Sequence, residues 1–203
     1  LPELASINDE VFALDPLERW QMQQQLVAQL KPNIEQGQNW QQQTEQQLEL
    51  FRLQGRLAVG SGAVLMQQDL VAGLEELAIG YQQFLSAFPT VDTGFYPLRF
   101  VSQHGELAEH LTGFRRSSDH QALACAELLP VALIKDRSIN WRHVIAPYLK
   151  LLLCCANGMP LTLYLLSRVG QLVLHPIEKP QAEQQLSQIL QLMQQGLSEP
   201  LAL

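Results

Sequence analysis

The sequence has little cysteine and no long apolar run. Its three cysteines include the adjacent pair Cys154 and Cys155. They provide neither a disulfide framework nor metal-ligand spacing, which favours a reducing compartment such as the cytoplasm. No apolar stretch reaches the roughly 20 residues of a transmembrane helix, and we expect no signal peptide before the first helix. These absences argue against a disulfide-rich secreted domain and against a membrane protein.

Charge is also scarce, and it is mostly negative. The chain has 13 Lys and Arg against 20 Asp and Glu, a net charge of −7. No basic field covers the whole domain, so any DNA contact must be local. The charged fraction of 16% is low beside a typical value of about 25%, and glutamine supplies much of the polar surface instead. Two explanations fit this composition: part of the surface is covered by other protein, or the chain has a glutamine-rich bias.

The first part of the chain predicts three helices. Asp15, Pro16 and Glu18 have the order of an N-cap, a first-turn proline and a capping-box acid, and we expect this helix to end at Lys31-Pro32. A second helix is expected over residues 40–54, ended by Gly55. The third is expected to run from the Gly60-Ser61-Gly62 turn to Pro89, because its apolar residues keep helical spacing.

After Pro89 the apolar period becomes that of strands. The pattern predicts a meander of three strands, covering residues 95–104, 105–116 and 121–133. The last of these is ambiguous, since residues 122–129 are rich in alanine and leucine and also suit a short helix.

The remaining elements are a helix, a hairpin and a helix. The helix is expected from Ser138 to the stop at Asn157-Gly158, with Pro147 either kinking it or marking a later start. Residues 161–166 and 171–174 predict a buried hairpin, and a last amphipathic helix is expected from Pro180. The predicted fold is α+β, with a helical part over residues 1–90 followed by a mixed sheet with flanking helices over residues 91–203.

Several runs, spread over nearly the whole chain, resemble the C-terminal domain of RecC, the gamma chain of bacterial exodeoxyribonuclease V. None of them is a catalytic signature, so the resemblance depends on their collinear order. Because the chain begins without methionine, we also expect it to be a piece of a longer protein. The runs that carry the likeness are residues 16–26 (PLERWQMQQQL), 51–60 (FRLQGRLAVG), 111–113 (LTG), 151–158 (LLLCCANG) and 196–201 (GLSEPL).

The resemblance implies a fold related to the PD-(D/E)xK nucleases in a subunit that has lost its active site. It implies a complex with the RecB helicase-nuclease and the RecD helicase, an ATP-dependent exodeoxyribonuclease and helicase that acts on DNA in double-strand break repair by homologous recombination. The role expected for this domain is subunit assembly and DNA strand guidance in the cytoplasm. No cofactor is expected for the domain itself, since Mg²⁺ and ATP would be used by the partner subunits.

The expected loss of activity depends on particular residues. Active relatives have an aspartate two or three residues after a glycine and an acid-x-Lys pair in the next strand. Here Gly113 is followed by Arg115 and Arg116, Glu127 is the only acid of the next strand, and Leu129 stands at the lysine position. Mg²⁺ binds several hard oxygen ligands, which Glu127 alone does not supply. Arg116, Glu127 and Leu129 are therefore predicted to be degenerate former metal-site positions, with no catalytic residue and no metal.

Three alternatives follow from the same residues. Arg115 and Arg116 are candidate contacts to DNA or to a partner subunit, or they are an ordinary solvated strand end. A surviving nuclease would use Glu127 with Asp119 or Asp136. An unrelated helical interaction module would have no central sheet.

Overall fold

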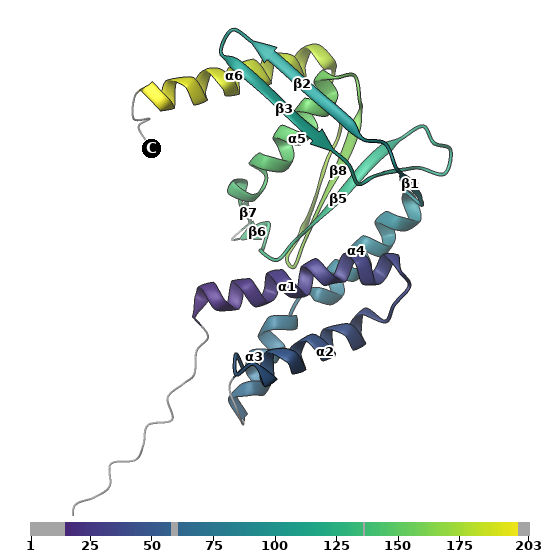
Figure 1. Ribbon diagram of the computed structural model, residues 1–203, viewed down its shortest axis with the longest axis vertical. Helices are drawn as coiled ribbons and strands as arrows, with labels where there is room; N and C mark the ends of the chain where they lie inside the picture. Colours follow the sequence, from purple (N-terminus) through teal and green to yellow (C-terminus); the bar gives the residue numbers. More distant parts are fainter. Residues whose placement is uncertain (1–14, 58–60, 136, 199–203) are drawn as a thin grey trace, which may run out of the picture. The chain divides into compact units, whose positions relative to one another are not determined.

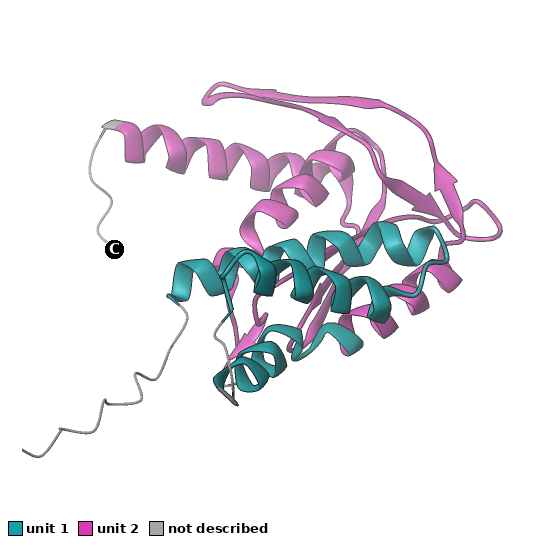
Figure 2. Ribbon diagram, turned by 60° about the horizontal axis from the view of Figure 1, so that its bottom comes forward, with its two compact units in different colours: residues 1–75 teal, residues 76–203 magenta. Residues whose placement is uncertain are grey.

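The computed structural model of the protein describes residues 15–57, 61–135 and 137–198. The chain forms two compact units, unit 1 over residues 1–75 and unit 2 over residues 76–203 (Figure 2). The two units meet inside helix α4 (Leu74–Ala87), most of which belongs to unit 2. A helical part over residues 1–90 and a mixed-sheet part over residues 91–203 remain the prediction from sequence.

Unit 1 contains the helices α1 (Pro16–Glu35), α2 (Trp40–Leu53) and α3 (Ser61–Val71). Helix α1 packs against both α2 and α3. Helix α2 begins where the Asn39 side chain accepts a hydrogen bond from the Gln42 amide, and it ends before Gly55, whose φ is +71°. The buried side chains of this unit include Met22, Leu26, Leu30, Phe51 and Leu70.

Two helix ends in this part differ from the prediction. Helix α1 continues through Pro32 for one more turn, because a proline removes a single backbone donor and the Gln36 amide still donates to the Pro32 carbonyl. The predicted third helix is in fact two helices, α3 and α4. Gly73 adopts φ +80° between them, and this left-handed conformation ends α3.

Unit 2 is built on a mixed sheet of five strands in the order β1-β4-β5-β8-β9. The long central pair, β5 and β8, is parallel, and α5 (Ile145–Ala156) makes the crossover between them (Figure 1). The other neighbours are antiparallel. The strands are β1 (Thr90–Asp92), β4 (Phe114–Arg116), β5 (Leu123–Leu129), β8 (Leu161–Ser167) and β9 (Gln171–Leu174).

Each face of this sheet has its own cover. On one face Phe84 of α4 and Phe88, which directly follows α4, stack on each other and contact Tyr164 of β8. On the other face lie α5 and α6 (Lys179–Ser198), together with a hairpin of β2 (Tyr96–Ser102) and β3 (Gly105–Leu111) (Figure 1). Strands β5 and β8 are therefore apolar on both sides, as expected for a buried parallel pair.

The predicted meander is wrong in one respect. The second predicted strand is interrupted at Gly113, which adopts φ +78°, so β3 and β4 belong to different sheets. Strands β2 and β3 form their own two-stranded sheet, inserted between β1 and β4. Strand β1 was not predicted. It is three residues long and pairs with β4, a partner distant in sequence.

The helix predicted from Ser138 starts later. Residues before it form a small hairpin of β6 (Ile134–Lys135) and β7 (Ser138–Ile139), and then a 3₁₀ turn, η1 (Trp141–His143). Helix α5 begins at Ile145, so Pro147 lies in its first turn, where a missing amide donor costs nothing. Of the two alternatives for Pro147, the later start is correct. The stop at Asn157-Gly158 and the hairpin of β8 and β9 are confirmed.

The predicted fold class is confirmed: the protein is α+β, with helices first and then a mixed sheet with flanking helices. The sheet rules out the alternative of a purely helical module. In the described part of the chain, no helix combines the length and the apolar character that crossing a membrane demands.

Candidate functional site

Arg116, one of the predicted degenerate positions, lies at the end of β4 and forms an ion pair with Asp92 of β1. The distance from Arg116 Nε to Asp92 Oδ2 is 2.7 Å. The Asp92 side chain is only 7% exposed, whereas that of Arg116 is 34% exposed. In the register of β1 and β4, Asp92 and Arg116 point to the same face of the sheet, the one that α5 covers.

Asp92 accepts further hydrogen bonds from its own loop. The Gly94 amide donates to Oδ1 at 2.8 Å, and the Tyr96 hydroxyl lies 3.0 Å from both carboxylate oxygens. Burial by itself raises the pKa of Asp92, but these donors and the Arg116 guanidinium outweigh it, so the pKa lies below its ordinary value. The carboxylate is thus ionised at neutral pH and accepts hydrogen bonds from three protein donors, Gly94, Tyr96 and Arg116.

Glu127, the second predicted position, pairs with a residue that we had not singled out. Lys150 of α5 places its Nζ 3.3 Å from Glu127 Oε1, and the two side chains are 22% and 32% exposed. Burial by itself lowers the pKa of Lys150, but Cys125 and Glu127 outweigh it and raise the pKa above its ordinary value. Glu127 is therefore neither isolated nor fully buried.

These two ion pairs lie on one face of the sheet with an aromatic side chain between them. Because side chains alternate along a strand, Glu127 of β5 shares the face of Arg116. Phe114 of β4 has the Tyr96 ring at 5.6 Å and the Lys150 ammonium at 5.7 Å from its ring centroid. We call this set the charged row, and it consists of Asp92, Arg116, Phe114, Lys150 and Glu127.

Arg115 points to the opposite face and has a different role. Its Nε donates to the Phe88 carbonyl at 2.8 Å, and one terminal nitrogen donates to the Pro89 carbonyl at 2.9 Å. These two carbonyls directly follow α4, which ends at Ala87. Arg115 therefore joins the segment after α4 to the sheet. Contact of Arg115 or Arg116 with DNA or a partner subunit stays a prediction.

The remaining candidate residues do not join the charged row. Leu129 is partly buried and packs on the apolar core. Asp119 lies in the turn after β4, where it accepts hydrogen bonds from the Ser117 hydroxyl and the Gln121 amide. Asp136 lies outside the described residues. Within the described ranges no three His, Cys, Asp or Glu side chains gather closely enough to hold a metal ion.

The cysteines are buried thiols in the core of unit 2. Cys125 lies on β5, and Cys154 and Cys155 lie on α5, and none of the three forms a disulfide bond with a described residue. Burial raises the pKa of Cys154 to about 12, with a further contribution from Cys125. Such a thiol stays protonated at neutral pH and is a poor nucleophile.

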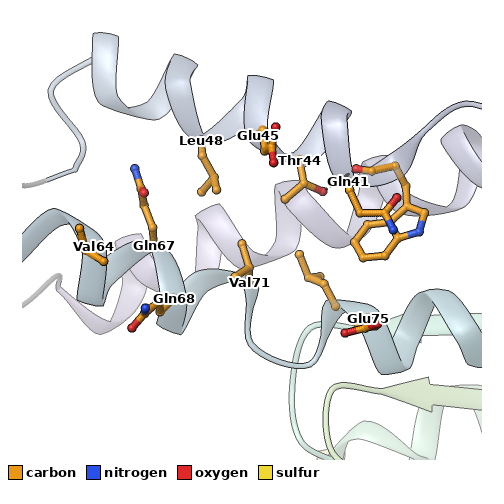
Figure 3. A pocket seen from close by; sticks show the side chains of 11 residues that line it. Gln41, Thr44, Glu45, Leu48, Val64, Gln67, Gln68, Val71 and Glu75 are labelled. Carbon is orange, nitrogen blue, oxygen red and sulfur yellow. Dashed lines mark hydrogen bonds between the residues drawn. The ribbon is translucent and has the colours of Figure 1, made fainter.

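A separate cavity lies within unit 1, between α2, α3 and the first residues of α4. Its volume is about 410 Å³. Figure 3 shows Leu48 of α2 and Val71 of α3 pointing toward one another across it. The lining is a mixture of apolar, glutamine and glutamate side chains, with no basic or histidine residue. It offers no acid–base pair for catalysis, so the charged row is the better candidate site.

Comparison with known families agrees with the likeness seen in the sequence. The family model of the RecC C-terminal domain matches residues 2–203. The chain belongs to the RecC C-terminal domain family. A RecC C-terminal domain is part of the gamma chain of the RecBCD complex, which acts on DNA in repair. A search of curated proteins found no match.

Sequence reasoning identified Arg116 and Glu127 but missed the partners of both. For Asp92 a local signal existed, because Asp-Thr-Gly is a typical turn in which the aspartate accepts the amide two residues on. For Lys150 the signal was a single charged residue in the apolar run of α5. A buried charge in such a run usually has a partner of opposite sign.

Proposed function

We propose that this RecC C-terminal domain is a non-catalytic, nuclease-like scaffold of the exodeoxyribonuclease V gamma chain. In this proposal it takes part in assembly with the RecB and RecD subunits and in guiding DNA strands during double-strand break repair by homologous recombination. Its function then depends on its surfaces and not on a reacting group.

The observation that carries the proposal is the ion pair of Arg116 with Asp92. The resemblance to PD-(D/E)xK nucleases puts a metal-binding acid near Arg116. Here a guanidinium occupies that place and satisfies the one buried carboxylate beside it, at 2.7 Å. A divalent cation brought there would meet the positive charge of Arg116 and a carboxylate that already accepts hydrogen bonds from three protein donors.

The second ion pair supports the same conclusion. Glu127 contacts Lys150, so the two acids of the charged row each have a protein cation as partner. Mg²⁺ needs carboxylates, often with substrate phosphate, in a near-octahedral arrangement. With both carboxylates engaged by cations, the charged row is suited to holding β1, β4, β5 and α5 together.

The proposal is tested first by an activity assay. The purified chain is incubated with linear duplex and single-stranded DNA and with Mg²⁺ or Mn²⁺, beside a Glu127→Gln variant. We expect no cleavage above that of a blank preparation, and no difference between the two proteins. Metal-dependent cleavage that the Glu127→Gln variant loses would overturn the non-catalytic assignment and favour a nuclease with a degenerate site.

Assembly is tested separately. A gamma chain lacking the segment that corresponds to residues 15–198 is co-expressed with RecB and RecD, and the complex is analysed by size-exclusion chromatography. We expect a subunit to be lost from the complex. A complete and stable complex without this segment would contradict the scaffold role.

The proposal includes no cofactor for this domain and places it in the cytoplasm. Three cysteines without a disulfide bond in the described core are consistent with a reducing compartment. Mg²⁺ and ATP would be used by the RecB and RecD subunits.

A further inference from the structure

Basic side chains gather at one end of unit 2, in the segment that joins β5 to α5. Residues 134–143 contain the three cations Lys135, Arg137 and Arg142, and one acid, Asp136, which lies outside the described residues. The whole chain has a net charge of −7. The net charge of this short segment is therefore positive, opposite in sign to that of the whole chain.

The segment is held in place by backbone hydrogen bonds. The Asn140 amide donates to the Leu133 carbonyl at 2.8 Å, and the His143 amide donates to the Asn140 carbonyl at 3.1 Å. The Ile134 amide lies 3.3 Å from the Val169 carbonyl, which joins the hairpin to the turn between β8 and β9. Figure 1 shows β6 and β7 beside the start of α5. The described backbone that presents these side chains is therefore fixed by hydrogen bonds at Ile134, Asn140 and His143.

The three cations differ from others in the chain. Lys135, Arg137 and Arg142 are exposed, and none of them forms an ion pair with a described residue. By contrast, three exposed arginines elsewhere already have acidic partners. These are Arg19 with Asp69, Arg52 with Glu49, and Arg99 with Glu106.

An exposed aromatic ring lies in the same segment as these cations. Trp141 directly precedes Arg142 in η1, and its side chain is 62% exposed. Leaving an indole in water forgoes the apolar burial that normally stabilises it. Cations along a backbone path together with an exposed aromatic platform are the combination that binds single-stranded nucleic acid.

We propose that this basic end, formed by Lys135, Arg137, Trp141 and Arg142, binds single-stranded DNA, with the cations on successive phosphates and the indole stacked on a base. The inference rests on the proposed strand-guiding function and names a surface for it. Single-stranded DNA is favoured over a protein partner because three cations within residues 135–142 of an otherwise acidic chain match the regularly spaced negative charges of a nucleic acid backbone. The contacts are to phosphates and to a ring face, so little sequence preference is expected.

The test measures binding in EDTA, so that cleavage plays no part. The probe is a fluorescein-labelled oligothymidine of about 20 nucleotides, which exceeds a typical site size. Fluorescence anisotropy is recorded for the chain at about 50 to 200 mM salt, the range over which phosphate contacts are lost. One variant combines Lys135→Gln, Arg137→Gln and Arg142→Gln. The matched control removes the same number of charges elsewhere and combines Arg19→Gln, Arg52→Gln and Arg99→Gln.

We expect the first triple variant to lose affinity at least tenfold, and the slope of log Kd against log salt to fall by about 2, since each phosphate contact on a single strand contributes about 0.7. The control triple variant should change affinity by less than about threefold, through net charge alone. Circular dichroism spectra check that both variants fold. Equal losses in the two triple variants, or none in the first, would overturn the proposal.

Stacking is tested by fluorescence quenching. The oligothymidine should quench part of the tryptophan emission of the wild-type chain, and Trp141→Phe should abolish that quenching, whereas Trp20→Phe should leave it. Quenching that survives Trp141→Phe would refute a stacked indole. If the first triple variant keeps DNA affinity but fails to assemble with RecB and RecD, this surface is a protein contact and the proposal is wrong. Cleavage or assembly results that contradict the scaffold function leave this binding measurement unaffected.

Discussion

The Arg116 guanidinium lies 2.7 Å from the Asp92 carboxylate, on a face of the sheet where only 7% of the Asp92 side chain is exposed. Replacing Arg116 by alanine would leave a buried negative charge without its cation. We expect the free energy of unfolding to fall by about 2 kcal/mol, because Gly94 and Tyr96 still donate to the carboxylate and limit the loss. Urea denaturation followed by circular dichroism measures the change.

The control for Arg116 is Arg99→Ala. Arg99 also pairs with an acid, Glu106, but both side chains lie in solvent, at 67% and 46% exposure. Exposed pairs contribute little, so we expect Arg99→Ala to lower the free energy of unfolding much less than Arg116→Ala does. Equal losses for Arg116→Ala and Arg99→Ala would mean that burial of Asp92 has no energetic role.

The stability that Asp92 provides should depend on pH. Its pKa is below the ordinary value in the folded protein, so the unfolded chain binds the proton more tightly. The contribution is fully present above the unfolded pKa of about 3.9 and is lost as the pH falls through the folded value. The difference in unfolding free energy between wild type and Asp92→Asn should therefore narrow from pH 6 toward pH 3. A constant difference over that range would contradict the shift.

The contact between Lys150 and Glu127 predicts a measurable coupling. Glu127→Gln, Lys150→Met and the double variant form a thermodynamic cycle, for which we expect a coupling of about 1 kcal/mol, since both partners are mostly shielded from solvent. The comparison pair is Lys179 with Glu183, which is exposed and separated by 3.8 Å. Its coupling should be below about 0.5 kcal/mol. A larger coupling between Lys179 and Glu183 would show that shielding from solvent does not strengthen the contact of Lys150 with Glu127.

Replacing Gly170 by alanine should destabilise the protein more than the same change at Gly37. Gly170 has both a left-handed backbone conformation and a close neighbour. Its φ is +89°, and an added Cβ would lie 2.6 Å from Ile134 Cδ1. Gly37 is the control, since it has φ +67° but open space around it. We expect Gly37→Ala to lower the free energy of unfolding by about 1 to 2 kcal/mol through backbone strain alone. Gly170→Ala should lower it clearly more.

The steric part of that cost can be isolated. Shortening Ile134 to alanine removes the atoms that an alanine at position 170 would meet. The double variant should then be less destabilised than the sum of the two single variants. Strict additivity in thermal or urea denaturation would show that the close approach of these residues is unimportant.

Local signals in the sequence were sufficient for much of the fold. Asn157-Gly158 correctly ended α5, and the turn before Gly170 correctly joined β8 to β9. Strand β1 could not be predicted in the same way, because three residues have no recognisable period and their pairing partner is β4. Gly113 was noticed only as part of a strand, since a sequence does not show that a backbone changes sheet there.

The same limit applies to the candidate site. Arg115 and Arg116 could be recognised as unusual, but their acceptors lie 24 to 27 residues earlier, at Asp92 and Phe88. Adjacent side chains on a strand point to opposite faces of the sheet. Arg116 therefore contacts Asp92 on one face, and Arg115 contacts the segment after α4 on the other. Tertiary packing determines which hydrogen-bond acceptors lie on each face. A single sequence does not reveal them.

The lengths of the strands in the five-stranded sheet bear on how any partner can attach. The two outermost strands, β1 and β9, have three and four residues, whereas β5 and β8 inside have seven each. A peptide that added to this sheet as a further strand could pair with only a few backbone N–H and C=O groups at either edge. Short edge strands also limit aggregation. Neighbouring subunits are therefore expected to recognise this domain through helix surfaces and side chains.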